Sequence, residues 1–176
     1  MKNINWNNVK DVDDRKRLTA GGYIARITSA KDEPAKEYTF IEYDIAEGEF
    51  KGYYKELYEA KNFWGGQTVK SYKEKAQPFY KAFLTAIKES NPGFMFNNDE
   101  RNLVGKVVGI VLGEEEYRKK DGGIGKRLYV NRFTSTDKIR TNDFDIPELK
   151  KLNPVTNADM SFYPVDNAEE DEDLPF

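Results

Sequence analysis

The sequence predicts a mainly β domain with one helix between its third and fourth strands. Glu37 to Ala46 alternates apolar with polar residues, as a half-buried strand does. Residues 103–113 are almost continuously apolar, which is typical of a central strand covered on both sides. Between these two stretches, apolar residues at spacings of three and four begin at Pro78, a pattern that indicates a helix.

Three strands are expected before the helix. Residues 21–28 are rich in β-branched and aromatic side chains and are followed by turn formers at 31–34. In the second strand, 37–46, every second residue points to the same face, and we expect that face to be buried. Its residues are Thr39, Ile41, Tyr43 and Ile45. After a turn at 47–52, Tyr53 to Tyr58 returns as a third strand of mostly aromatic and charged side chains.

The helix and the last two strands follow. We expect the helix to run from Pro78 to residues 91–93, with apolar residues Phe79, Tyr80, Phe83, Leu84 and Ile87. The strand at 103–113 continues through charged residues to a glycine-rich, basic tip at 121–125, and residues 126–135 return as its hairpin partner. Residues 143–152 look like a short closing segment.

Three strands, a helix and two strands is the order of the OB-fold, a five-stranded Greek-key barrel. A half-open sheet with a packed helix would give the same order, so the order alone leaves both architectures open. With 176 residues the chain is long enough for one closed core. We therefore expect an N-terminal arm at 1–20, an OB-fold domain at 21–152 and a flexible acidic tail at 153–176.

The composition excludes several kinds of chemistry. The sequence has no Cys and no His, which removes disulfides, thiolate zinc sites, Cys or His nucleophiles and any Ser-His-Asp triad. Residues 122–127 lack the spacing and the Ser or Thr of a phosphate loop, and residues 143–148 lack the Gly of a calcium loop. We expect no enzyme activity, metal or cofactor. A magnesium nuclease built from scattered acids stays open, although nothing in the sequence groups them.

The ends of the chain carry no membrane signal. No apolar run approaches the ~20 residues of a membrane span, and the first residues lack the apolar core of a signal peptide. We expect a cytoplasmic protein with no membrane partner.

Charge is divided unequally between the body and the C-terminal end. All 28 Lys and Arg precede residue 152, whereas six of the 31 acids lie at or after Asp166, so residues 1–165 carry 28 − 25 = +3. Acids this close together repel one another and stay in water, so they favour a partner with a basic surface. The terminal aromatic residue beside a proline is an exposed apolar group, so it favours a partner with an apolar pocket. The expected partner-binding residues are Asp171, Glu172, Asp173, Leu174, Pro175 and Phe176.

The sequence is 14% aromatic at only 38% hydrophobic, so we expect some rings on the surface. In an OB-fold, the middle strands and the loops after the first and fourth strands line the binding groove. Rings and cations alternate there, as needed to stack unpaired bases and to follow phosphates. The candidate residues for binding single-stranded DNA are Tyr53, Tyr54, Lys55, Tyr58, Lys61, Phe63, Trp64, Arg118, Lys119, Lys120, Lys126, Arg127, Tyr129 and Arg132. Taken singly, each aromatic residue is more often part of strand packing. For Tyr38 and Phe40, exposure to the groove and burial under the N-terminal arm both stay open.

Two parts of the sequence resemble known proteins. Residues 40–52, 103–106, 113–117, 139–140 and 146–152, with Gly22-Tyr23, resemble a family of small single-stranded DNA-binding proteins from phages and prophages of Gram-positive bacteria. The acidic Leu-Pro-Phe end resembles the tip of bacterial and phage single-stranded DNA-binding proteins, with Leu174 where Ile is more usual.

The resemblance implies an OB-fold protein in the cytoplasm of the bacterial host. It would coat and protect single strands without sequence preference and recruit replication, recombination and repair proteins through its tip. A replisome adaptor that binds protein in the groove, and a recombination mediator or annealing protein, are the alternatives. The sequence leaves a homo-oligomer open.

Overall fold

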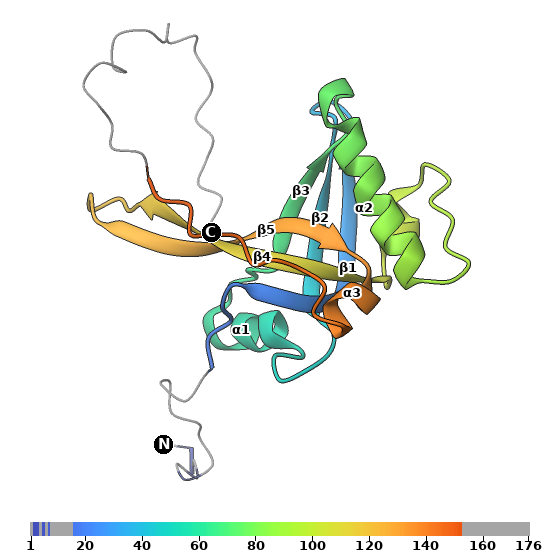
Figure 1. Cartoon of the computed structure of the whole chain (residues 1–176). Coiled ribbons are helices and arrows are strands. Elements are labelled where there is room, and N and C mark those ends of the chain that lie inside the picture. The colour runs from blue at the N-terminus through green and yellow to red at the C-terminus, as the bar shows by residue number, and fades with distance from the viewer. Residues whose placement is uncertain (1, 4, 6, 8–15, 153–176) are drawn as a thin grey trace, which may run out of the picture.

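The computed structural model describes residues 2, 3, 5, 7 and 16–152, which include a five-stranded antiparallel sheet with helices around it (Figure 1). Along the sheet, the strands follow the order β3-β2-β1-β4-β5. The strands are β1 (Gly21–Glu33), β2 (Tyr38–Ile45), β3 (Gln67–Ser71), β4 (Val107–Arg118) and β5 (Ile124–Thr134). The helices are α1 (Tyr53–Lys61), α2 (Gln77–Ser90) and α3 (Thr136–Arg140), with 3₁₀ turns at Glu74–Ala76 and Glu100–Leu103. The expected β-rich chain with a helix between its third and fourth strands is confirmed; α1 and α3 are additional.

Strand β1 is shared by the two halves of the sheet. Gly21 to Arg26 pair with β4, whereas Ala25 to Glu33 pair with β2. The register with β2 shifts between Ile27 and Ser29, and a bulge of this kind bends a strand and increases its twist. The bend lets one strand belong to two half-sheets that face in different directions.

The two edge strands of the sheet, β3 and β5, approach each other through their side chains. The ammonium nitrogen of Lys70, on β3, lies 4.6 Å from the ring centroid of Phe133, on β5. Phe83 of α2 packs beside them, with its ring centroid 4.6 Å from that of Phe133. Burial lowers the pKa of Lys70. The two edges of the open sheet are therefore in side-chain contact beside α2, without a backbone ladder between β3 and β5 among the described strands.

The core confirms the patterns of β2, α2 and β4. On β2, Thr39, Ile41, Tyr43 and Ile45 are all buried, as their alternation predicts. On α2, Phe83 and Ile87 are buried, whereas Phe79 is 71% exposed. On β4, Val108, Ile110 and Leu112 join the main core, and Val111 joins a second cluster with Ile24 and Ile139. Strand β4 is thus covered on both sides, as its continuous apolar run predicts.

The expected third strand at Tyr53 to Tyr58 is wrong, because these residues form α1 and the third strand is Gln67–Ser71. Tyr53, Tyr54 and Leu57 pack against the core at helical spacing. The carboxylate of Asp44, at the end of β2, accepts hydrogen bonds from the backbone N–H groups of Tyr54 (2.9 Å) and Lys55 (3.3 Å). It therefore acts as a cap for α1, since the residue before the helix, Gly52, has no side chain to do so.

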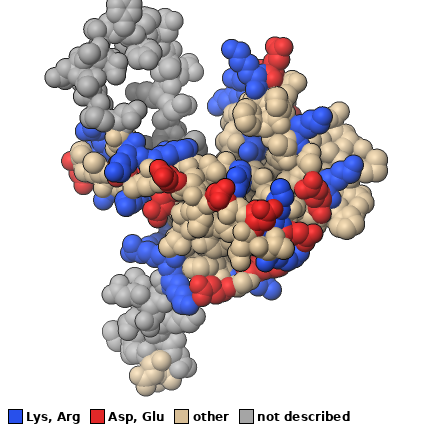
Figure 2. Space-filling view, viewed as in Figure 1, with Lys and Arg blue, Asp and Glu red and all other residues tan. Residues whose placement is uncertain are grey.

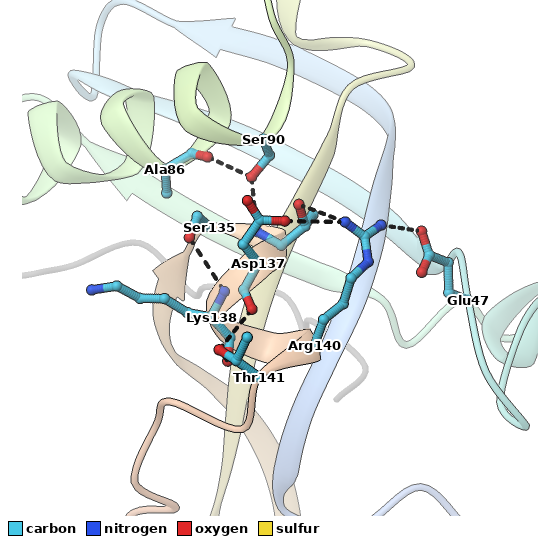
Figure 3. Close-up of polar contacts among 9 residues, drawn as sticks. Glu47, Ala86, Ser90, Ser135, Asp137, Lys138, Arg140 and Thr141 are labelled. Atoms are coloured by element: carbon cyan, nitrogen blue, oxygen red, sulfur yellow. Dashed lines mark hydrogen bonds and ion pairs between the residues drawn. The ribbon is translucent and has the colours of Figure 1, made fainter.

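Helix α3, which directly follows β5, is held in place by polar contacts with two other parts of the chain (Figure 3). The hydroxyl of Ser90, at the end of α2, accepts a hydrogen bond from the backbone N–H of Thr136 (3.0 Å) and donates one to the Ala86 carbonyl (2.7 Å). The Arg140 guanidinium donates to Glu47 Oε1 at 2.8 Å, which connects α3 to the turn after β2. These contacts connect α3 to α2 and to the turn before α1.

The segment after α3 lies along the sheet, as the expected closing segment would. A Cβ on Gly22 would meet the Phe144 ring, and one on Gly113 would meet Pro147 at 2.7 Å. Lys150 forms a parallel bridge with Glu115, and its backbone N–H donates to the Glu114 carbonyl at 3.0 Å. Most of the expected N-terminal arm and the whole tail lie outside the described residues.

Buried tyrosines predict a loss of stability at alkaline pH. Burial raises the pKa of Tyr43 to about 12 and raises the pKa of Tyr54, whose ring centroid is 5.5 Å away, even more. The unfolded chain loses these protons near pH ~10. The stabilisation is therefore fully present below that pH and is lost as the pH rises toward the folded value, by about 3 kcal/mol for Tyr43 alone. Denaturant titrations between about pH 9 and pH 12 measure this slope. Tyr43→Phe should reduce it, and equal slopes in the two proteins would contradict the assignment.

Candidate functional site

An exposed tyrosine on α1 lies beside a half-buried tryptophan, with a lysine three residues to either side of the tyrosine. Tyr58 is 49% exposed, and its ring centroid is 6.3 Å from that of Trp64, with the two planes at 65°. Lys55 and Lys61 lie three residues before and after Tyr58, so both side chains neighbour it on the helix surface, and both are exposed. We call Lys55, Tyr58, Lys61 and Trp64 the α1 surface.

A layer of buried rings supports the α1 surface from below. Tyr54 is only 5% exposed, and its ring centroid lies 6.4 Å from that of Trp64. Tyr53 is half-buried and packs edge-on against both Tyr54 and Phe50. The indole Nε1 of Trp64 donates to the Gly66 carbonyl at 3.2 Å, which orients the indole. Tyr53 and Tyr54 therefore support the site, whereas Tyr58 and Trp64 can meet a ligand.

A second surface lies on the outer side of β1, β2 and β3. Residues directly opposite in an antiparallel pair share a face, and Phe40 lies opposite Lys31 on β1 and Val69 on β3. Val69 is 49% exposed and Phe40 is half-buried. The next row is Tyr38, with Glu33 and Ser71 on either side. We call these two rows the half-sheet face.

Sequence reasoning missed Lys31 because the first strand was expected at 21–28 with a turn at 31–34, whereas β1 continues to Glu33. It missed Val69 because the third strand was placed at the wrong residues. The signal was present: Gly65-Gly66 precede Gln67 to Ser71, a short run with the β-branched pair Thr68 and Val69. Phe40 and Tyr38 are both half-buried. Burial under the N-terminal arm, the alternative for these two residues, involves residues outside the described part of the chain.

Cations gather at the end of the β4–β5 hairpin, which projects beyond the other strands (Figure 1). Arg118, Lys119, Lys120 and Lys126 are all exposed there. Figure 2 shows Lys and Arg side chains along this hairpin, with Asp and Glu interspersed. From Tyr117 to Arg127 the chain has five cations and one acid, a net charge of 5 − 1 = +4.

The remaining candidates lie on the opposite face of the hairpin, on β5. Arg127 donates to Glu115 Oε1 at 2.8 Å, and its guanidinium carbon is 5.5 Å from the Tyr117 ring centroid. The Lys150 ammonium lies over the Tyr129 ring, 3.8 Å from its centroid. The buried Tyr129 hydroxyl makes no hydrogen bond with any described residue. One face of the Tyr129 ring is therefore covered, whereas Arg132 is exposed.

The fourteen candidates thus lie in three places. Seven belong to α1 and the loop after it, with Phe63 half-buried near Gly65. Four are at the hairpin tip, and three are on the outer face of β5. The six tail residues, 171–176, lie outside the described part of the chain.

The described residues also bear on metals and membranes. Within 2, 3, 5, 7 and 16–152, no group of three or more acids that could hold a metal ion is present. In the same residues, no helix has both the length and the apolar character needed to cross a membrane.

No protein-family model matches the sequence, and no curated protein matches it. Any function must therefore be argued from the surfaces described above.

Proposed function

We propose that the protein binds single-stranded DNA without sequence preference and coats and protects it during phage replication and recombination. The observation that carries the proposal is the α1 surface, where the exposed ring of Tyr58 packs beside the half-buried indole of Trp64 and neighbours Lys55 and Lys61 on the helix. Unpaired bases expose their flat faces, and a base stacked on an aromatic ring contributes about 1–3 kcal/mol. Neither a ring nor a lysine distinguishes one base from another, so the binding has no sequence preference.

An OB-fold barrel is the architecture that we propose for this sheet. Its support is the order β3-β2-β1-β4-β5, with a long bulged first strand shared by both halves. Contact between Lys70 and Phe133 brings the two edges together beside α2. In such a barrel, the face of the second and third strands and the loop between the last two strands contact the nucleic acid. Those parts are the half-sheet face and, at the end of the hairpin, the cations Arg118, Lys119, Lys120 and Lys126.

Phosphate contacts make such binding sensitive to salt. Each lysine that neutralises a phosphate of a single strand adds about 0.7 to the negative slope of log affinity against log salt. Replacing Lys55 and Lys61 by Gln should therefore weaken binding at low salt and make this slope less negative by about 1.4. Fluorescence anisotropy with a labelled oligo-dT of about 30 nucleotides, over a salt series, measures it.

A matched control is available on another face of the protein. Lys81 and Lys88 are exposed on α2, so replacing both by Gln changes the net charge equally without touching the α1 surface. If both pairs of substitutions change the slope equally, general charge attraction explains the binding and the α1 surface does not.

The tail is proposed to recruit partners. The six residues Asp171, Glu172, Asp173, Leu174, Pro175 and Phe176 would bind replication and recombination proteins in the cytoplasm of the bacterial host. The supporting observations are their sequence, with acids running into an apolar end, and its resemblance to the tips of single-stranded DNA-binding proteins. In this proposal the protein itself catalyses no reaction.

One observation favours a second candidate function. The half-sheet face exposes Val69 next to Phe40, and an aliphatic side chain beside a ring suits a protein partner as well as a base. A replisome adaptor would use this face and leave oligonucleotides unbound. Titration of the folded protein with the oligo-dT strand separates the two functions, because only the first one predicts saturable binding.

A further inference from the structure

The β4–β5 hairpin continues beyond the rest of the sheet as a two-stranded arm. Pairing between β1 and β4 ends at Gly21 opposite Leu112, whereas β4 and β5 stay paired as far as Arg118 opposite Ile124. As far as residue 152, where the described part of the chain ends, the closing segment covers the base of the arm, through the bridge between Lys150 and Glu115. The outer part of the arm, which we define as residues 117–127, therefore projects past the body (Figure 1).

The tip of this arm is held by its own hydrogen bonds. The Lys119 N–H donates to the Gly123 carbonyl at 2.8 Å, and the Gly122 N–H donates to the Lys119 carbonyl at 2.9 Å. The Asp121 carboxylate accepts from the Gly123 N–H at 2.8 Å. Gly122 has a φ of 83°, a value that favours glycine. The tip thus has a defined shape that presents its side chains outward.

An apolar side chain stands at this tip between two cations. Ile124 is 63% exposed. It lies directly opposite Arg118, and Lys126 follows two residues later on the same face. The same face leads inward through Leu128, which packs against the core cluster that Trp64 also contacts. One face of the arm therefore runs from the main core out to Ile124.

The positive charge of the arm lies at its outer end, whereas Glu114, Glu115 and Glu116 lie at its base, so residues 113–130 as a whole carry 5 − 4 = +1. Glu115 is paired with Arg127 at 2.8 Å, and Glu116 accepts a hydrogen bond from the Leu152 N–H at 3.2 Å. Without Arg127, which is paired with Glu115, residues 117–126 carry 4 − 1 = +3, in a chain whose formal net charge is −3. Such a tip attracts phosphates.

We propose that this arm binds the end of a DNA duplex where it meets a single strand. A two-stranded ribbon fits a DNA groove, and proteins insert apolar side chains such as Ile between base steps. Inside a duplex, insertion requires unstacking, but the last base pair at a junction already exposes one face. Ile124 packs on that face, while Arg118 and Lys126 contact phosphates on either side of it. The inference rests on the proposed function, because the single strand held on the body brings the duplex to the arm.

The test compares three DNA molecules by fluorescence anisotropy: an oligo-dT of about 30 nucleotides, a duplex without a tail, and the same duplex with that oligo-dT as its tail. The wild-type protein is expected to bind the tailed duplex about tenfold more tightly than the oligo-dT alone. Ile124→Ser should remove this preference and leave the affinity for oligo-dT unchanged. Ile146→Ser is the control, because Ile146 is 54% exposed and lies outside the arm.

Each outcome decides between the two proposals. Binding of oligo-dT without a preference for the tailed duplex overturns the role of the arm alone. So does a preference that survives in Ile124→Ser or is lost equally in Ile146→Ser. If the folded protein binds no oligo-dT, the proposed function itself fails, and the role of the arm fails with it.

Discussion

Replacing Phe40 and Tyr58 together by Ala should weaken the binding of oligo-dT at least about 30-fold. Each ring that is removed loses the stacking of one base, which contributes about 1–3 kcal/mol to the binding free energy. The two residues represent the half-sheet face and the α1 surface. Tyr58 is 49% exposed, and Phe40 is not among the residues that pack against the core clusters, so the double variant should stay folded. Anisotropy titrations of the variant and the wild type at the same salt concentration measure the effect.

The control for this prediction is another exposed ring. Phe79 on α2 is 71% exposed and belongs to neither surface, so Phe79→Ala should leave the affinity unchanged. Unchanged affinity in the Phe40 and Tyr58 double variant would contradict base stacking at these positions. Equal losses in the double variant and in Phe79→Ala would show that the rings act through general hydrophobicity.

Phe83→Ala should destabilise the fold by about 3–5 kcal/mol, the range for removing a large buried aromatic side chain. Phe83 is 1% exposed, and its ring lies 5.8 Å from Tyr80 and 4.6 Å from Phe133 between centroids. The Lys70 ammonium is 6.0 Å from the same ring, so Phe83 packs where the edges of the sheet approach. Urea denaturation followed by circular dichroism measures the free energy of unfolding.

The control for Phe83→Ala is Phe79→Ala, a substitution on the same helix, α2. Phe79→Ala removes an equal side chain that is mostly in water, so it should change the free energy of unfolding by no more than about 0.5 kcal/mol. Similar losses for Phe79→Ala and Phe83→Ala would mean that α2 does not face the sheet as described. A small loss for Phe83→Ala would mean that β3 and β5 do not depend on this helix to come together.

The parts of the fold that the sequence predicts are those with an unambiguous period. Strand β2 alternates without exception over its eight residues, and β4 has an apolar run that is too continuous for a one-sided strand. Helix α2 has Pro at its first turn and a clear apolar stripe. In these elements local preference and tertiary packing favour the same structure, so the sequence alone identifies them.

Helix α1 shows why the rest was not predictable. Its aromatic residues have high strand propensity, and the carboxylate that caps it, Asp44, precedes Tyr54 by ten residues and sits on another element. Tertiary packing of Tyr53, Tyr54 and Leu57 decides in favour of the helix. Misplacing this one element moved the third strand and hid Val69, the residue that β3 contributes to the half-sheet face beside Phe40.

The sequence predicted which residues form the α1 surface, but not which of the neighbouring rings are buried. Lys55, Tyr58, Lys61 and Trp64 were named because rings and cations are interleaved in the sequence. The spacing of three residues from Lys55 to Tyr58 and from Tyr58 to Lys61 places them side by side only because the backbone is helical; on a strand they would alternate between its two faces. Burial was not predictable in the same way. Tyr54 became part of the core, and Tyr129 was covered by Lys150, a residue that follows it by 21 positions and reaches it only through the closing segment.

The stacking of bases on the α1 surface is tested most directly by the fluorescence of Trp64. The sequence has two Trp residues, Trp6 and Trp64, so a Trp6→Phe variant leaves Trp64 as the only indole. Titration of this variant with oligo-dT should quench its emission to a saturating value, and the quenching should weaken with salt, whereas duplex DNA of the same length should quench far less. Emission that stays constant while anisotropy reports bound oligo-dT would contradict base stacking at Trp64.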